Sequence, residues 1–155
     1  MRIELTLNQE KRTMEVELND VLLDVLRDKF GCKSPKCGCD RGDCGACTVL
    51  INGQSVRSCL VLAAEVHGQT VVTAEGLSKD GLNSVQRAFA RRNAFQCGYC
   101  APGMTLAATE LLAKKPHPCR ADVQEALAGN LCRCTGYQPI IEAVLEAAAN
   151  REDKP

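Results

Sequence analysis

Eleven cysteines in a chain of 155 residues are the feature that most constrains this sequence. Eleven is an odd number, so pairing them all as disulfides would leave one thiol over. Charges interrupt residues 1–12, which lack the apolar segment and cleavage site of a secretory signal. We therefore expect a reducing, cytoplasmic location, where dense cysteines indicate metal or redox chemistry rather than disulfides.

Composition excludes several other classes of protein. Lys plus Arg and Asp plus Glu both number 19, so the chain has no net charge with which to attract nucleic acid or an anionic membrane. The longest apolar run, residues 59–64, is far too short to span a membrane. No phosphate-binding loop, nucleophile elbow or paired carboxylates stand out, so we expect no catalytic residue in this chain.

The first half of the chain has the pattern of a small sheet. Asn52 and Gly53 form the strongest short hairpin signal, residues 8–13 predict a turn, and residues 21–30 predict a helix with one apolar face. Strands are predicted at residues 3–7, 14–18, 48–51, 54–58 and 70–73. These elements indicate a β-grasp sheet wrapped over one helix, in a domain of residues 1–75.

The second half has the pattern of helices alone, which makes the fold class α+β. Four helices are predicted at residues 84–92, 102–114, 121–128 and 139–150. Gly76, Lys79, Asp80 and Gly81 indicate a linker, so we expect residues 76–155 to form a second, four-helix domain. The charged residues 151–155 are expected to fray.

Four cysteines in the first half are spaced like the ligands of a plant-type [2Fe–2S] ferredoxin. Four residues separate Cys39 from Cys44, two separate Cys44 from Cys47, and Cys59 follows after eleven more. The hairpin before Cys59 can return it to the loop. Small residues between the ligands let the backbone pass close to a cluster and donate hydrogen bonds to its sulfur atoms.

A second set of four cysteines lies in the helical half. Cys97 and Cys100 precede one predicted helix, and Cys132 and Cys134 precede another. Thiolates are favoured at helix N-termini, so two such ends could hold a four-thiolate site in the middle of a bundle. Structural zinc is the alternative for both sets, because four thiolates also suit zinc.

Three stretches carry a resemblance to a known family. Residues 38–49 read GCDRGDCGACTV, residues 96–104 read QCGYCAPGM, and residues 129–137 read GNLCRCTGY. In this order and spacing, the chain resembles the iron–sulfur subunit of the molybdenum hydroxylases, the family of xanthine dehydrogenase and aldehyde oxidoreductase. The resemblance covers essentially the whole chain.

The resemblance implies an electron-transfer subunit with two [2Fe–2S] clusters. A large subunit would carry a molybdopterin-type cofactor and a medium subunit would carry FAD, in a dimer of heterotrimers. By motif position, Gln96 and Cys134 would lie against the pterin. The PGM motif after Cys100 resembles the flavin-containing branch. The chain departs from the family pattern at Ser34, where Gly is usual, and at Ala101, where Thr or Ser is common.

Two further interpretations remain open. Three cysteines, Cys32, Cys37 and Cys119, belong to neither set. We interpret them as small packing residues, which is a simpler explanation than a redox switch. For the whole chain, the alternative function is a stand-alone ferredoxin-like carrier or a zinc-stabilised adaptor. The zero net charge argues against a carrier that docks transiently.

Overall fold

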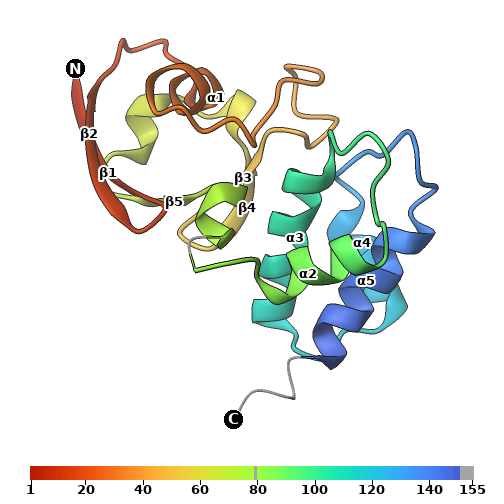
Figure 1. Ribbon diagram of the computed structural model, residues 1–155. Coiled ribbons are helices and arrows are strands. Elements are labelled where there is room, and N and C mark those ends of the chain that lie inside the picture. The colour runs from red at the N-terminus through yellow and green to blue at the C-terminus, as the bar shows by residue number, and fades with distance from the viewer. Residues whose placement is uncertain (79, 151–155) are drawn as a thin grey trace.

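The first half of the chain forms one five-stranded sheet beside a short helix (Figure 1). The computed structural model describes residues 1–78 and 80–150. The strands are β1 (Arg2–Leu7), β2 (Glu10–Glu15), β3 (Thr48–Ile51), β4 (Gln54–Arg57) and β5 (Thr70–Val72). Their order in the sheet is β2-β1-β5-β3-β4, with β1 and β5 parallel and the other pairs antiparallel.

The sheet buries its apolar face against the helix that follows β2. Helix α1 (Leu22–Asp24) continues as a π-helical turn (Val25–Lys29). Alternate residues of β1 point to the same side of the sheet and are buried with this helix. The shared core consists of Ile3, Leu5, Leu7, Val16, Leu22, Val25, Leu26, Cys32, Val49, Ala63, Val66 and Val71.

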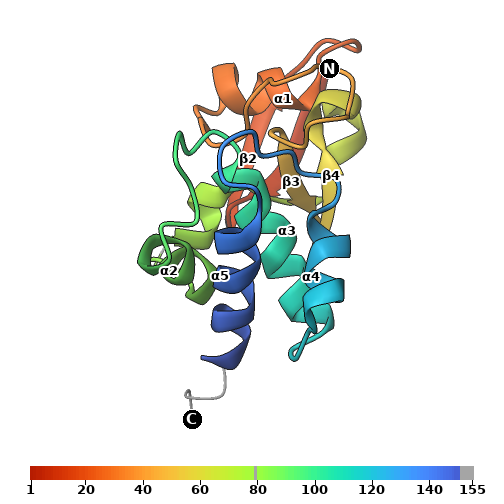
Figure 2. The ribbon, with the colours of Figure 1, turned by 90° about the vertical axis from the view of Figure 1, so that its right-hand side faces the viewer.

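The second half of the chain is a bundle of four helices (Figure 2). They are α2 (Ser84–Arg91), α3 (Ala101–Lys114), α4 (Arg120–Leu127) and α5 (Gln138–Ala149). Asn83 caps α2 by accepting a hydrogen bond from the amide of Gln86 at 2.8 Å. Pro102 and Pro139 lie in the first turns of α3 and α5, where a missing N–H costs nothing.

Most predicted elements are confirmed, and the differences are local. The turn between β1 and β2 is only Asn8 and Gln9, both with positive φ, so the second strand begins at Glu10 rather than at residue 14. Short 3-10 segments that were not predicted occur at Ser58–Leu60, Ala63–Val66 and Ala74–Ser78. The last of these lies within the predicted linker. Lys79 and residues 151–155 lie outside the described residues.

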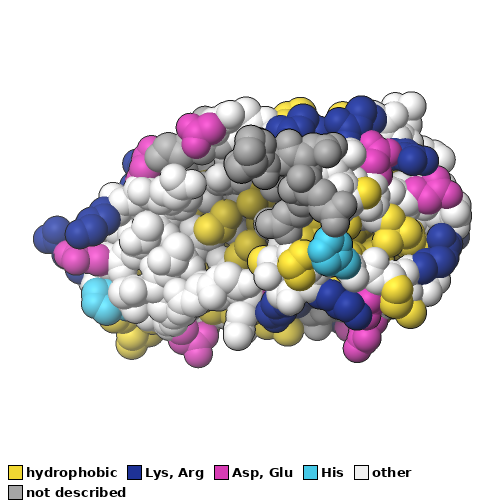
Figure 3. All heavy atoms as spheres, turned by 90° about the horizontal axis from the view of Figure 1, so that it is seen from below, with side chains coloured by type: hydrophobic (Ala, Val, Ile, Leu, Met, Phe, Trp, Pro, Cys, Tyr) yellow, Lys and Arg dark blue, Asp and Glu magenta, His cyan; other side chains and the backbone are white. Residues whose placement is uncertain are grey.

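The two halves are in contact through α3, which packs on β3 and β4. Leu106 of α3 is buried with Leu50 and Ala74 from the first half. Within the described residues, no helix is both long and apolar enough to cross a membrane. On the face shown in Figure 3, basic and acidic side chains are interspersed, in keeping with a net charge of zero.

Candidate metal centres

Three cysteines of the first set, Cys39, Cys44 and Cys47, lie in the loop that connects the π-helical turn to β3. Asp40, Gly42 and Gly45 have positive φ, and this coils the loop around its own sulfur atoms. The sulfur of Cys39 accepts a hydrogen bond from the amide of Cys44 at 3.4 Å, and the sulfur of Cys44 accepts one from Ala46 at 3.5 Å. The backbone therefore directs N–H groups at sulfur, as a negatively charged cluster requires.

Cys47 and Cys59 complete the first set from the buried side of the loop. Cys47 precedes β3 and Cys59 follows β4, so the β3–β4 hairpin brings them together, as predicted. Their sulfur atoms are 3.4 Å apart and both residues are buried. All eleven cysteines are free thiols, so this close contact is not a disulfide.

The thiols of this set differ in how easily they ionise. Hydrogen bonds from the amides of Arg41 and Cys44 lower the pKa of Cys39 to about 7. Burial, followed by the neighbouring Cys47 thiol, raises the pKa of Cys59 to about 12. A buried thiol of this kind becomes a thiolate only beside positive charge, which bound iron or zinc supplies.

The second set lies at one end of the bundle rather than in its middle. Cys97 is exposed, whereas Cys100, Cys132 and Cys134 are half-buried. The sulfur atoms of Cys97 and Cys134 are 3.6 Å apart. The prediction of a site buried among the helices is therefore wrong for the isolated chain. Its cysteines lie in the loops before α3 and α5, and both loops make hydrogen bonds to the first cysteine loop.

Polar groups of neighbouring residues form hydrogen bonds with the cysteines of the second set. The sulfur of Cys132 accepts a hydrogen bond from the amide of Thr135 at 3.5 Å, and the Cys132 amide donates to the hydroxyl of Tyr137 at 3.0 Å. The side chain of Gln96 donates to the carbonyl of Cys134 at 3.1 Å. Gln96 is exposed beside the site.

The two sets lie next to each other in space. The amide of Leu131 donates to the carbonyl of Cys44 at 2.8 Å, which joins the two loops directly. On another side, the hydroxyl of Tyr99 donates to the carbonyl of Cys37 at 2.7 Å. Tyr99 and Tyr137 were not predicted as supporting residues, and their positions beside the cysteines were the only signal in the sequence.

The arrangement of thiols suits a two-iron cluster better than a single ion. Each set contains two thiol pairs, and in each set one pair is joined by a thiol–thiol contact, Cys47 with Cys59 and Cys97 with Cys134. The pairs are Cys39 with Cys44, Cys47 with Cys59, Cys97 with Cys134, and Cys100 with Cys132. A [2Fe–2S] cluster needs two thiolates on each of two irons, whereas zinc needs four around one centre.

The three remaining cysteines lie outside both sets. Cys32 packs in the core of the first domain, and burial raises its pKa. Cys37 is exposed. Cys119 precedes α4, and its amide donates to Asp122. Packing or capping thus accounts for Cys32 and Cys119 without a redox role.

Comparison with known proteins identifies both halves of the chain. Residues 5–78 match the model of the 2Fe-2S iron-sulfur cluster binding domain, and residues 73–145 match that of the [2Fe-2S] binding domain. The nicotine 6-hydroxylase small subunit of Paenarthrobacter nicotinovorans is 48% identical, over 95% of this chain and 89% of its own. The nicotinate dehydrogenase small FeS subunit of Eubacterium barkeri is also 48% identical, over 96% of this chain and 97% of its own.

A solved structure agrees with these relatives. A chain of quinoline 2-oxidoreductase from Pseudomonas putida 86 superimposes with a TM-score of 0.93 at 45% identity, covering 100% of this chain and 98% of that one. Similarity of this extent includes both cysteine loops and both domains. The fold and the two matched domains confirm two [2Fe–2S] binding domains in an electron-transfer subunit. The chain belongs to the small iron–sulfur subunits of the molybdenum hydroxylase family.

Proposed function

We propose that eight cysteines hold two [2Fe–2S] clusters, with one thiol pair on each iron. Cys39, Cys44, Cys47 and Cys59 bind the first, and Cys97, Cys100, Cys132 and Cys134 bind the second. The observation that carries this assignment is the pairing of free thiols within each set, at 3.4 Å for Cys47 with Cys59 and 3.6 Å for Cys97 with Cys134. The clusters supply one-electron transfer, and the chain's own groups bind them and donate hydrogen bonds to sulfur.

The proposed partner subunits rest on where the two cysteine sets are exposed on the chain. The second set lies at the surface of the isolated chain, and Gln96 is exposed and bonded to the Cys134 carbonyl. This supports a large molybdenum subunit docking there, with Gln96 and Cys134 against its pterin. A medium, FAD-binding subunit then covers the first cluster. Electrons pass between molybdenum and flavin through the two clusters, in a cytoplasmic dimer of heterotrimers.

The order of burial in this relay differs from the sequence-based expectation. The helix-held cluster was expected to be the more protected of the two. In the isolated chain, two ligands of the first set are buried, whereas none of the second set is. Solvent exposure and hydrogen bonds to sulfur both tune cluster potentials, so the potentials of the two clusters should still differ.

The test is electron paramagnetic resonance of the anaerobically purified complex, reduced with dithionite, with iron and zinc analysis of the same sample. Two distinct S = 1/2 signals, with about two spins and about four irons per copy of this chain, are expected. A protein with stoichiometric zinc and no signal would instead be the zinc-stabilised adaptor. One signal with about two irons per copy of this chain would mean that only one of the two cysteine sets binds a cluster.

A further inference from the structure

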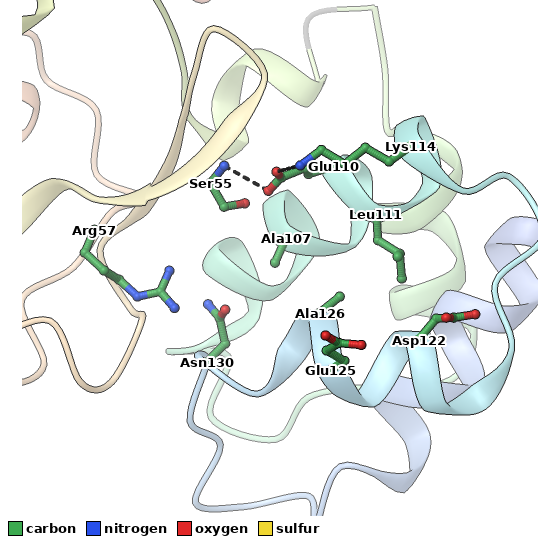
Figure 4. A pocket seen from close by; sticks show the side chains of 10 residues that line it. All are labelled: Ser55, Arg57, Ala107, Glu110, Leu111, Lys114, Asp122, Glu125, Ala126 and Asn130. Atoms are coloured by element: carbon green, nitrogen blue, oxygen red, sulfur yellow. Dashed lines mark hydrogen bonds and ion pairs between the residues drawn. The ribbon is translucent and has the colours of Figure 1, made fainter.

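A buried polar junction joins the two cysteine loops beside α3. Its members come from the first loop and its strands and from the turn after α4, and we call them the loop junction. They are Gly45, Thr48, Arg57, Gly129 and Asn130. Figure 4 shows two of them, Arg57 from β4 and Asn130 from the turn after α4, near each other next to Ala107 of α3.

The amide of Asn130 is the centre of this junction. Asn130 is only 3% exposed, which is rare for an asparagine. Its side-chain nitrogen donates to the carbonyl of Gly45 and to the hydroxyl of Thr48, both at 3.1 Å. The backbone carbonyl of Asn130 accepts a hydrogen bond from the hydroxyl of Tyr137. That hydroxyl in turn accepts a hydrogen bond from the amide of Cys132. One residue thus contacts the immediate neighbours of two ligands of the first set and is linked through Tyr137 to the backbone of the ligand Cys132.

The other members hold the same contact from the first domain. Arg57 donates to the hydroxyl of Thr48 at 2.9 Å and to the carbonyl of Gly129 at 2.5 Å. Thr48 donates to the carbonyl of Gly45 at 2.6 Å. Among the described residues, no buried side-chain nitrogen or oxygen of this group lacks a hydrogen-bond partner.

The backbones at the junction are too close to admit side chains. A Cβ added to Gly45 would overlap the carbonyl oxygen of Gly129. A Cβ added to Gly103, in the first turn of α3, would lie 2.6 Å from the carbonyl oxygen of Gly45. Close packing of this kind is hard to compress, so the two loops have little freedom to change their separation.

We propose that Asn130 is a positioning residue that fixes the distance and relative orientation of the two clusters. Gly45 lies between the ligands Cys44 and Cys47, and Asn130 lies two residues before the ligand Cys132. A displacement at this junction therefore moves one ligand set against the other. Electron tunnelling falls steeply with distance, so a fixed separation sets the rate of transfer between the clusters. This inference rests on the proposed ligand sets.

The test compares Asn130→Ala and Thr48→Val with wild type in the assembled complex. Both variants remove hydrogen bonds of the loop junction, and neither removes a proposed ligand. Thr105→Val is the matched control, because it removes one buried hydrogen bond, from Thr105 to the Pro102 carbonyl, away from the junction. The readouts are iron content, the two EPR signals, and the magnetic interaction between the reduced clusters from pulsed EPR.

The expected result is unchanged iron with a shifted or broadened interaction in Asn130→Ala and Thr48→Val, and a wild-type interaction in Thr105→Val. An unaltered interaction in both junction variants would overturn the positioning role and leave the two-cluster assignment intact. An equal change in Thr105→Val would overturn it too, because it would show a general loss of packing. Should Asn130→Ala lose iron, Thr48→Val alone decides. Absence of two signals in wild type would contradict the proposed function itself.

Discussion

At the residue scale, the cysteines are distinguished by what lies around their sulfur atoms. The sulfur atoms of Cys39 and Cys132 accept backbone hydrogen bonds from residues of their own loops. Cys119, by contrast, lies at the N-cap of α4, where it contacts Asp122 of the same helix and, within the described residues, no other cysteine. A thiolate ligand needs donors or positive charge around it, and a packing cysteine does not.

Single substitutions should therefore remove the clusters separately. Cys47→Ala should abolish one EPR signal and Cys132→Ala the other, each halving the iron content, because a cluster needs all four thiolates. Cys119→Ala is the control and should retain both signals. Loss of iron in Cys119→Ala, or loss of the same signal in both ligand variants, would contradict the assignment.

Two glycines with similar backbone angles should respond very differently to alanine. Gly45 and Gly68 have φ of +73° and +75°. Gly68 has open space around it, so Gly68→Ala should lower the free energy of unfolding only by the strain of a left-handed alanine, about 1–2 kcal/mol. Gly45→Ala must also displace the Gly129 backbone and should cost about 3 kcal/mol or more. Denaturant unfolding measures the loss of stability in both variants. Equal losses would show that the two cysteine loops can move apart at little energetic cost.

At the element scale, helix α4 begins with an ion pair that makes its stability depend on pH. Asp122 accepts hydrogen bonds from Lys115 at 2.7 Å and from the amide of Cys119 at 2.6 Å. These contacts, led by the Lys115 hydrogen bond, lower the pKa of Asp122 to about 2. An aspartate in an unfolded chain titrates near about 3.9. The carboxylate therefore stabilises the fold above that value, and this contribution is lost as the pH falls towards 2.

Asp122→Asn tests this dependence directly. At pH 6 the variant should be less stable than wild type, and the difference should shrink as the pH is lowered through 4 towards 2. Urea unfolding of the two proteins side by side gives that difference at each pH. Glu125→Gln, on the same helix, is the control, since the structure shows no ion pair for Glu125 within the described residues. A difference that stays constant with pH would rule out the carboxylate as the cause.

The helices were predictable from sequence and the placement of the second cysteine set was not. Local signals such as Asn83, Pro102 and Pro139 define helix ends, and the predicted ends agree with α2 to α5 within one residue. The spacing of Cys39 to Cys59 is likewise a local pattern. The position of Cys97 at the surface depends on how two helix ends meet another domain, which no local pattern encodes.

The second strand shows the same limit on a smaller scale. Alternating Met14, Val16 and Leu18 predicted a strand, but β2 ends at Glu15. The side chain of Val16 packs in the core of the first half, and its amide bonds to the carbonyl of Met1, whereas Leu18 is 74% exposed. Apolar alternation predicts which residues favour burial, and the register of the neighbouring strand decides which of them achieve it.

At the scale of the whole molecule, two hydrophobic cores meet through a small apolar contact and through hydrogen bonds that include the loop junction. The sheet and α1 share one core, and α2 to α5 share the other. Between them lies the cluster of Leu50, Ala74 and Leu106. We propose that residues 1–75 and 76–155 are separate folding units, held in one arrangement by this contact and by Asn130. A relay needs such an arrangement, since each cluster is bound by a different unit.

Leu106→Ala should therefore uncouple the two units. Leu106 is 1% exposed, and truncating a buried leucine costs about 2–5 kcal/mol, here largely from the contact between units. As guanidinium is raised, wild type should lose its two cluster signals together, because the contact makes unfolding cooperative. In Leu106→Ala the signals should disappear at separate concentrations, with the less stable unit first. Leu82→Ala, at a half-exposed position, should behave like wild type. Coincident loss in Leu106→Ala would mean that the hydrogen bonds between the units couple them without the apolar contact, and adding Asn130→Ala, which removes the central bonds of the loop junction, should then separate the two signals.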